Sequence, residues 1–207
     1  MTKEVILETD TFSEEQMDLL QELINIGVGR AADALSQLVE SRIQLCVPEV
    51  KMFGSQQAQE IFDARAISEE TMVTQSFSGS VDGRLGMLLD KQSAILLTSI
   101  LGEEEHCDDE ISLEQEGILL EVGNIVLNGV MGSISNAIND QLDYSIPEIA
   151  RSNSIKMLLA DNLLDKPTVL LADVRLHVEN SAIEGSIIIV FDVDAISMAL
   201  DEIINEA

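Results

Sequence analysis

Apolar residues recur at helical spacing in two long stretches, one beginning near residue 13 and the other near residue 112. Each stretch opens on a Ser-x-x-Gln pattern. This pattern is typical of a capping box, in which the Ser hydroxyl accepts a hydrogen bond from the helix backbone and the Gln reaches back. We therefore predict a long helix at the start of each stretch. In the first helix, four apolar residues lie mainly on the side expected to face the core: Leu19, Leu20, Leu23 and Ile26.

Runs rich in apolar and β-branched residues follow each helix and are typical of strands. They cover about 43–53, 63–77 and 81–89 in the first half of the chain, and about 142–150, 168–179 and 182–192 in the second. Each half closes on another apolar helical stretch, at 93–101 and 194–204. The order of helix, strands and helix in both halves predicts an α+β fold with a mostly antiparallel sheet.

The two halves are also related by a repeat with an offset of 99 residues. Three residues of the first half recur at that offset: Glu22, Asn25 and Pro48 correspond to Glu121, Asn124 and Pro147. The chain has only three prolines, so a match of two of them favours duplication over chance. We predict an internally duplicated fold with pseudo-two-fold symmetry, in which each repeat contributes one long helix that carries site residues.

A single domain over residues 1–207 is expected, because interlocked repeats share one core. Repeat one covers about 13–101 and repeat two about 112–206, and the acidic stretch 102–111 between them is expected to be a solvated linker. The segment 151–167 has no match in the first half. It is expected to hold an extra packed helix or a partner-binding element.

The chain is strongly acidic: 11 Lys and Arg against 38 Asp and Glu give a formal net charge of −27. Such a charge argues against binding to nucleic acid or to anionic membrane surfaces, because both need a basic surface. No apolar run approaches the ~18–20 residues of a membrane span, and the N-terminus has no signal-peptide pattern. His106 and Cys107 have no spaced partner pair for a metal, and Cys46 and Cys107 make no disulfide framework. A cytoplasmic protein without a metal of its own is expected.

The repeated Glu and Asn share one helix face by their spacing. On a helix, Glu22 and Asn25 lie about 60° apart, and Asp18 precedes Glu22 by about one turn. Like charges four residues apart cost roughly a few tenths of a kcal/mol in an isolated helix. A helix built only for stability would more often place Lys there. In the second copy, Gly117 takes the place of Asp18.

A Glu and an Asn without a nearby His or nucleophile do not form an active site of their own. An Asn can hold a water molecule for attack, as a Gln does in GTP hydrolysis, and an exposed Glu can pair with a Lys of another protein. The pair therefore suits a protein that completes a half-built site on a partner. The segment from Gly27 to Ala32 matches the dinucleotide fingerprint G-x-G-x-x-A but lies inside a predicted helix. Its glycines are expected to allow close helix packing or a bend.

The spacing Asp/Ser-x3-Glu-x2-Asn-x22-Pro resembles the signature of the CheC/CheX/FliY family of chemotaxis phosphatases. The first copy carries it as Asp18, Glu22, Asn25 and Pro48, and the second as Gly117, Glu121, Asn124 and Pro147. The resemblance implies a phosphatase (a hydrolase) that removes the aspartyl phosphate of a phosphorylated CheY-type response regulator in a two-component system.

The same resemblance implies a role for each residue of the motif. Asn25 and Asn124 would insert beside the phosphate and orient the attacking water. Glu22 and Glu121 would bind the regulator's active-site Lys. Asp18 would help to orient or dock the partner, and it could equally be an exposed acid favoured by the helix dipole. Mg²⁺ is expected on the partner regulator, a CheD deamidase is a further candidate partner, and the duplication favours a monomer.

The alternative function is a non-catalytic binding or scaffolding module for a response regulator or a flagellar switch. Flagellar motor proteins with a related domain resemble the family in fold but lack the Glu-x-x-Asn pair, so the two pairs favour the enzyme. Exposure of Asn25 and Asn124 on outward helix faces would support catalysis, and burial of both in the core would contradict it. Pro48 and Pro147 are expected to have a structural role at a strand edge, since Pro interrupts a ladder.

Overall fold

The structure is a computed structural model that describes residues 12–38, 42–65, 70–102, 111–151, 158, 167–178 and 181–206. The helices are α1 (Glu14–Leu38), α2 (Ser55–Arg65), α3 (Lys91–Gly102), α4 (Leu113–Ala137) and α6 (Val193–Glu206). The strands are β1 (Ile43–Gly54), β2 (Glu70–Ser78), β3 (Gly83–Asp90), β4 (Asp143–Tyr144), β5 (Glu148–Arg151), β6 (Pro167–Val178) and β7 (Ser181–Asp192). All strand pairs are antiparallel, so the predicted α+β class with a mostly antiparallel sheet is confirmed.

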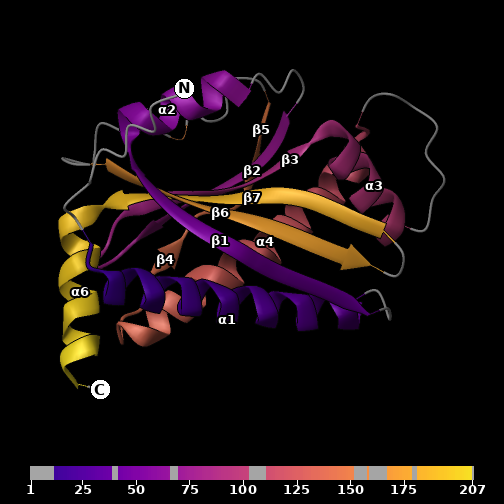
Figure 1. The fold of residues 1–207 in the computed structure, drawn as a ribbon. Helices are drawn as coiled ribbons and strands as arrows, with labels where there is room; N and C mark the ends of the chain where they lie inside the picture. The colour runs from indigo at the N-terminus through magenta and orange to yellow at the C-terminus, as the bar shows by residue number, and fades with distance from the viewer. Residues whose placement is uncertain are drawn as a thin grey trace.

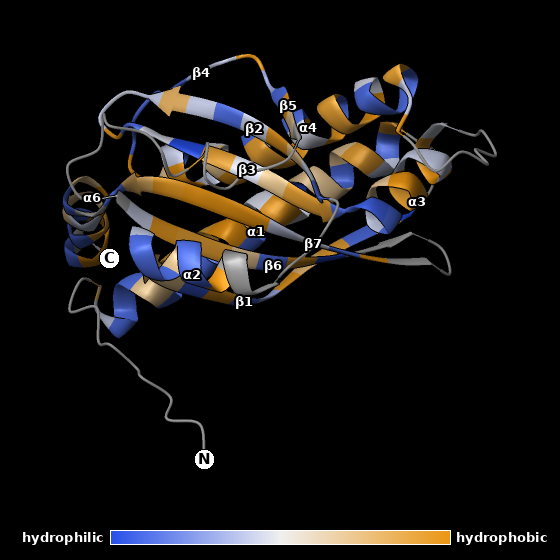
Figure 2. Ribbon diagram, turned by 90° about the horizontal axis from the view of Figure 1, so that it is seen from above, coloured by the Kyte–Doolittle hydropathy of each residue, from blue (hydrophilic) through white to orange (hydrophobic). Residues whose placement is uncertain are grey.

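One seven-stranded sheet organises the fold, with α1 and α4 along one face and α2 on the other (Figure 1). The larger hydrophobic core lies between the sheet and α1 and α4, with α6 packed against α1 and α3 against α4. A smaller core on the other face includes Ala58 of α2 and Leu158. Helices cover both faces of the central strands, which explains why β6 and β7 are apolar along most of their length (Figure 2).

Both predicted capping boxes are present, and each also fixes a neighbouring helix. At the start of α1, Gln16 N donates to Ser13 Oγ over 3.1 Å and Ser13 N donates to Gln16 Oε1 over 2.8 Å. At the start of α4 the same two bonds join Ser112 and Gln115. The amide of each Gln then reaches another helix. Gln16 Nε2 donates to Asp201 Oδ1 of α6 over 2.9 Å, and Gln115 Nε2 donates over 3.1 Å to a hydroxyl of α3.

The strand order is β1-β6-β7-β3-β2-β4, and β5 also pairs with β2. The first strand of each predicted repeat therefore pairs with the second strand of the other repeat. The pairing registers agree as well. Glu49 faces Asp173 and Glu148 faces Thr74, and each residue of one pair lies 99 positions from its counterpart in the other. This exchange of edge strands supports the predicted duplication and pseudo-two-fold symmetry, which stay predictions.

α1 and α4 cross where two glycines bring the helix backbones together. A Cβ atom added to Gly27 would lie 2.5 Å from the carbonyl oxygen of Gly129. Buried Ser133 of α4 donates to the carbonyl oxygen of Leu23 in α1 over 2.5 Å. The fingerprint-like segment therefore lies inside α1, and Gly27 serves close packing as predicted. Gly29, by contrast, has open space around its Cβ position.

The structure corrects two sequence predictions. Helix α2 was not predicted, and it ends at Arg65, so the strand predicted from residue 63 begins instead at Glu70. Ile26 does not face the core, because 41% of its surface is exposed. It lies four residues after Glu22 and therefore shares the outward face of the helix.

Some predictions fall on residues outside the described part of the chain. These include His106, Cys107 and most of the acidic linker, together with segment 151–167 apart from Arg151, Leu158 and Pro167. By length and composition alone, α4 is apolar enough to cross a membrane, although no such run was expected. Half of its apolar window is buried in the fold. Among the described residues, α4 is the one helix that meets this criterion.

Candidate functional site

The first Glu-Asn pair lies on the side of α1 that faces solvent. Asp18, Glu22 and Asn25 are all exposed. Nine residues on the other side of α1 are buried against the sheet and α4: Gln16, Leu20, Leu23, Ile24, Gly27, Val28, Ala31, Ala32 and Leu35. The periodicity of the helix thus separates a packing side from a side that is free to meet another protein.

The second pair lies on α4 in the corresponding arrangement, with one difference. Gly117 and Glu121 are exposed, but Asn124 is only partly exposed. Its Oδ1 accepts a hydrogen bond of 2.8 Å from Asn128 Nδ2, one turn further along the helix. Asn25 is exposed and Asn124 is half-buried, so neither lies in the core, and the condition that would have contradicted catalysis is not met.

Asn128 is the residue of this site that sequence reasoning missed. The signal was present, because Asn128 follows Asn124 by four residues and two polar side chains at that spacing can meet on a helix. The repeat did not point to Asn128, because the position 99 residues earlier is Gly29. Asn128 is also unusual in its own bonding. Its Oδ1 is buried and has no hydrogen-bond partner in the described part of the chain.

The exposed side of α1 is more acidic than that of α4. Around the first pair, the acids are Glu15, Asp18 and Glu22, all exposed. Around the second pair, exposed acids remain only at Glu114 and Glu121, because Gly117 replaces the middle one. Both surfaces therefore favour a partner with a basic contact region, and the attraction is stronger at the first.

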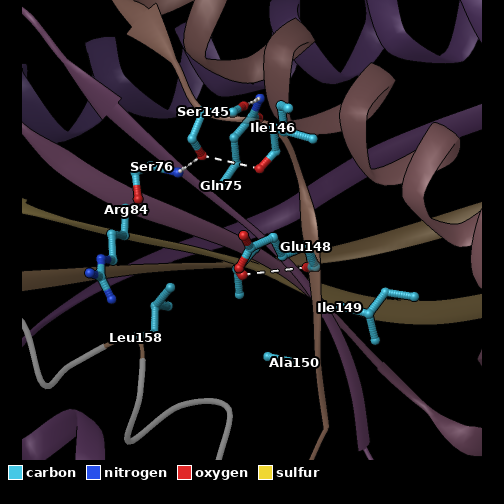
Figure 3. Close-up of a pocket in the computed structure, with 10 residues that line it drawn as sticks. Gln75, Ser76, Arg84, Ser145, Ile146, Glu148, Ile149, Ala150 and Leu158 are labelled. Carbon is cyan, nitrogen blue, oxygen red and sulfur yellow. Dashed lines mark hydrogen bonds between the residues drawn. The ribbon is translucent and has the colours of Figure 1, made fainter.

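Neither pair sits in an enclosed pocket. A cavity of about 280 Å³ lies on the other side of the sheet, beside β5, and is lined in part by Gln75, Arg84 and Glu148 (Figure 3). None of its lining residues comes from α1 or α4. Within the described residues, no three His, Cys, Asp or Glu side chains come together as metal ligands. Glu-Asn pairs on open helix faces suit action on a macromolecule better than enclosure of a small substrate.

The two prolines lie at irregularities of the edge strands. The ladder between β1 and β6 shifts register between Cys46 and Glu49, and Pro48 falls within that shift. At the other edge, Pro147 lies between β4 and β5, where the pairing with β2 is interrupted. Both positions agree with the structural role that was predicted, because a Pro cannot donate to a ladder.

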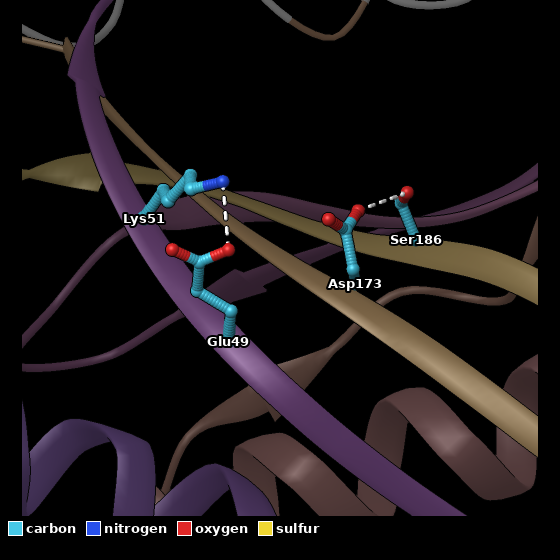
Figure 4. Close-up of polar contacts among 4 residues, drawn as sticks. All are labelled: Glu49, Lys51, Asp173 and Ser186. Atoms are coloured by element: carbon cyan, nitrogen blue, oxygen red, sulfur yellow. Dashed lines mark hydrogen bonds and ion pairs between the residues drawn. The ribbon is translucent and has the colours of Figure 1, made fainter.

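The residue after each proline resumes the ladder, and on the β1 side its surroundings are polar. Glu49 Oε2 lies 2.7 Å from Lys51 Nζ on the same strand (Figure 4). On the neighbouring strands, Ser186 Oγ donates to Asp173 Oδ1 over 3.0 Å. The ion pair is exposed, so its contribution to stability is small. Glu49 thus takes part in strand pairing and in a surface ion pair, and both contacts are structural rather than catalytic.

Two titratable groups beyond the end of α4 have shifted pKa values. Hydrogen bonds from Ser80, one of them from its backbone N over 3.0 Å, hold the pKa of Asp140 below its ordinary value. Burial raises the pKa of the Tyr144 hydroxyl. Both groups lie away from the Glu-Asn pairs, so their titration bears on stability rather than on the site.

Comparison with known proteins gives a family match at the first pair. The model of the CheC-like family matches residues 15–52, a range that contains Asp18, Glu22, Asn25 and Pro48. The CheY-P phosphatase CheC of Bacillus subtilis is 24% identical over 140 residues, which are 66% of this chain and 66% of CheC. The flagellar motor switch phosphatase FliY of the same organism is 25% identical over 147 residues, which are 70% of this chain but only 38% of FliY.

Solved structures share the fold at lower sequence identity. Thermotoga maritima FliY has a TM-score of 0.74 at 16% identity, covering 95% of this chain and 99% of that structure. The FliM middle domain of H. pylori has a TM-score of 0.65 at 13% identity, covering 92% and 99%. The CheX–CheY–BeF3–Mg complex of Borrelia burgdorferi has a TM-score of 0.52 at 17% identity, covering 83% and 99%. Together, the family match and the two relatives confirm the resemblance to the CheC-like family that was seen in the sequence, and the solved structures show the shared fold.

Proposed function

We propose that the chain hydrolyses the aspartyl phosphate of a CheY-type response regulator. The observation that carries this proposal is the outward exposure of Asn25 on α1, one turn from Glu22 and within the segment that matches the CheC-like family. Similarity to a CheY-P phosphatase and to a CheX bound to CheY supports the reaction and the partner class.

In the proposed reaction, the role of this chain is to position the attacking water molecule. The regulator supplies the phosphoryl group, its Mg²⁺ and an active-site Lys. Asn25 enters beside the phosphate, and its amide holds a water molecule in line with the phosphorus atom. Glu22 pairs with the Lys and so fixes the angle at which the Asn enters. Holding a nucleophile in place lowers an orientational barrier, and a tenfold to hundredfold acceleration needs only about 1.4–2.8 kcal/mol.

We propose that the duplication gives the chain two such sites. Glu121 and Asn124 on α4 act as Glu22 and Asn25 do on α1, so one monomer holds up to two regulators. Exposed acids around each pair attract the basic contact region of the regulator and raise the rate of encounter. A cytoplasmic location, and control by a CheD-type deamidase, belong to the same proposal.

The experiment that tests the proposal is phosphate release from a Mg²⁺-bound, phosphorylated CheY-type regulator. Wild type, Asn25→Ala, Asn124→Ala and the double variant are compared, with Asn136→Ala as the matched control because it is an exposed Asn of α4 outside both pairs. We expect acceleration by wild type and the control, a partial loss in each single variant and a complete loss in the double variant. Release that is equal in wild type and the double variant would overturn the proposal.

A scaffold for a regulator or flagellar switch is the second candidate, favoured by the similarity of the fold to a FliM middle domain. This function predicts binding of the phosphorylated regulator without faster loss of phosphate. Binding measured by titration alongside the release assay separates the two candidates. In a scaffold, both Asn→Ala changes leave the lifetime of the phosphate unaltered.

A further inference from the structure

The two Asn side chains that define the proposed sites are held differently. Asn25 is exposed, and no hydrogen bond to its side chain is found among the described residues. Asn124 is half-buried and accepts a bond of 2.8 Å from Asn128 Nδ2. Gly29 corresponds to Asn128 in the first copy and has no side chain that could donate a hydrogen bond to Asn25.

The bond leaves Asn124 able to act on a water molecule. An amide oxygen has two acceptor sites and an amide nitrogen has two donor hydrogens. The contact with Asn128 uses one acceptor site, so the second acceptor and both donors of Asn124 stay available. At the same time it restricts rotation of the amide, which would otherwise have to be ordered when the partner binds.

Asn128 is bonded in a way that stability alone does not explain. Its own Oδ1 is buried without a partner in the described part of the chain, and an unpaired buried acceptor carries a desolvation cost. Asn is also a weaker helix former than Ala. A residue selected only to stabilise α4 at this place would be apolar or Ala.

We propose that Asn128 is a positioning residue of the second site, which pre-orients the Asn124 amide, so that the two sites of the chain are not equivalent. The second site is pre-organised, whereas the first must order Asn25 during each encounter. This inference rests on the proposed function for its catalytic meaning. The restraint on Asn124 can be measured without any regulator.

Kinetic measurements on variants with a single working site test the role of Asn128 at each site separately. Asn128→Ala is introduced into Asn25→Ala, where only the second site works, and into Asn124→Ala, where only the first works. We expect kcat of the second site to fall by about twofold to tenfold, the cost of re-ordering one side chain, with KM unchanged. The first site is expected to keep its kcat. An unchanged second site, or an equal fall at both sites, would overturn the inference.

The reciprocal change tests the same idea in the first copy. Apart from its own helix backbone, the Cβ position of Gly29 has no atom within 4 Å, so the Cβ of Gly29→Asn displaces no neighbour. It places a donor one turn after Asn25, as Asn128 stands one turn after Asn124. We expect kcat of the first site to rise, with Gly29→Ala as the control that changes the backbone without adding an amide. A rise that Gly29→Ala reproduces in full would count against positioning.

Two further readouts separate this inference from the proposed function. Thermal unfolding should show that Asn128→Ala is at least as stable as wild type, because the change removes an unpaired acceptor and adds a better helix former. Side-chain ¹⁵N relaxation of the free protein should show Asn124 more rigid than Asn25, and mobile once Asn128 is replaced. Equal mobility of Asn124 and Asn25 in wild type overturns the positioning role, whatever the phosphatase assay gives. Loss of rigidity in Asn128→Ala upholds it even if no variant hydrolyses phosphate.

Discussion

Replacement of Gly27 by Ala should loosen the crossing of α1 and α4. The new Cβ would lie 2.5 Å from the Gly129 carbonyl oxygen, 2.5 Å from Val130 Cα and 2.8 Å from Ser133 Oγ. Two of these atoms belong to the backbone of α4, so a side-chain rotation cannot relieve the contact. The helices must separate instead, and the short bond from Ser133 Oγ to the Leu23 carbonyl oxygen is lost with the separation.

The magnitude follows from three opposing contributions. Overpacking of a well-packed contact costs about 1–3 kcal/mol, and loss of one buried hydrogen bond costs about 1 kcal/mol. Ala in place of Gly gains about 1 kcal/mol through helix propensity. The net expectation for Gly27→Ala is a loss of about 1–3 kcal/mol in the free energy of unfolding.

Gly29 supplies the matched control, because it lies two residues away in the same helix and has no atom within 4 Å of its Cβ position. Gly29→Ala should therefore show only the propensity gain and raise stability by up to about 1 kcal/mol. Urea unfolding of both variants and wild type measures the two effects directly. Equal stability of Gly27→Ala and Gly29→Ala would refute the reasoning, since it would mean that no close helix contact exists at Gly27.

Three other predictions concern the sites and the dependence on pH and salt. Gly117 is exposed and its Cβ position is open, so Gly117→Asp meets no neighbour at Cβ. The change should lower KM of the second site by about twofold to fivefold, measured in the Asn25→Ala background. An unchanged KM would mean that the acid does not contact the partner. The value of kcat/KM should fall more steeply with NaCl for Asn124→Ala, which keeps only the more acidic first site, than for Asn25→Ala; equal salt slopes would contradict this. The pKa of Asp140 is lowered in the folded state by Ser80, so its stabilisation is present above the unfolded pKa and is lost as pH falls through the folded pKa. The difference in unfolding free energy between wild type and Asp140→Asn should therefore shrink at acid pH, and a difference independent of pH would exclude this linkage.

Local signals in the sequence predicted the parts of the fold that are set by neighbours along the chain. The capping boxes at Ser13 and Ser112 depend on residues three apart, and both formed as expected. The outward face of α1 followed from helical periodicity, with an error at Ile26, which lies between the two sides. Helix α2 was missed because only Ala58 of its described side chains is fully buried, so it carries almost no apolar periodicity.

Long-range pairing was beyond the sequence pattern, even though the repeat was visible. Each repeat has apolar, β-branched runs that are clear enough to locate its strands, but nothing local says that β1 pairs with β6 rather than with β2. The repeat identifies only residues that recur, such as Asn124. It does not identify Asn128, because the matching position of the first copy is a Gly. A difference between copies held as much information about the site as their agreement.

The crossing of α1 and α4 connects the two proposed sites through one rigid contact. Asn25 lies two residues before Gly27, which is less than one turn of α1 from the helix crossing. Asn124 lies five residues before Gly129, which is a little more than one turn of α4 from the same crossing. A change at the crossing should consequently disturb both sites together, whereas Asn128→Ala should disturb one. If Gly27→Ala alters phosphate release at the first site alone, the helices move independently and the crossing is only a packing contact. If both sites respond in proportion to the loss of stability, the outward faces of α1 and α4 depend on the same contact, and the small residues there are part of how the sites are held.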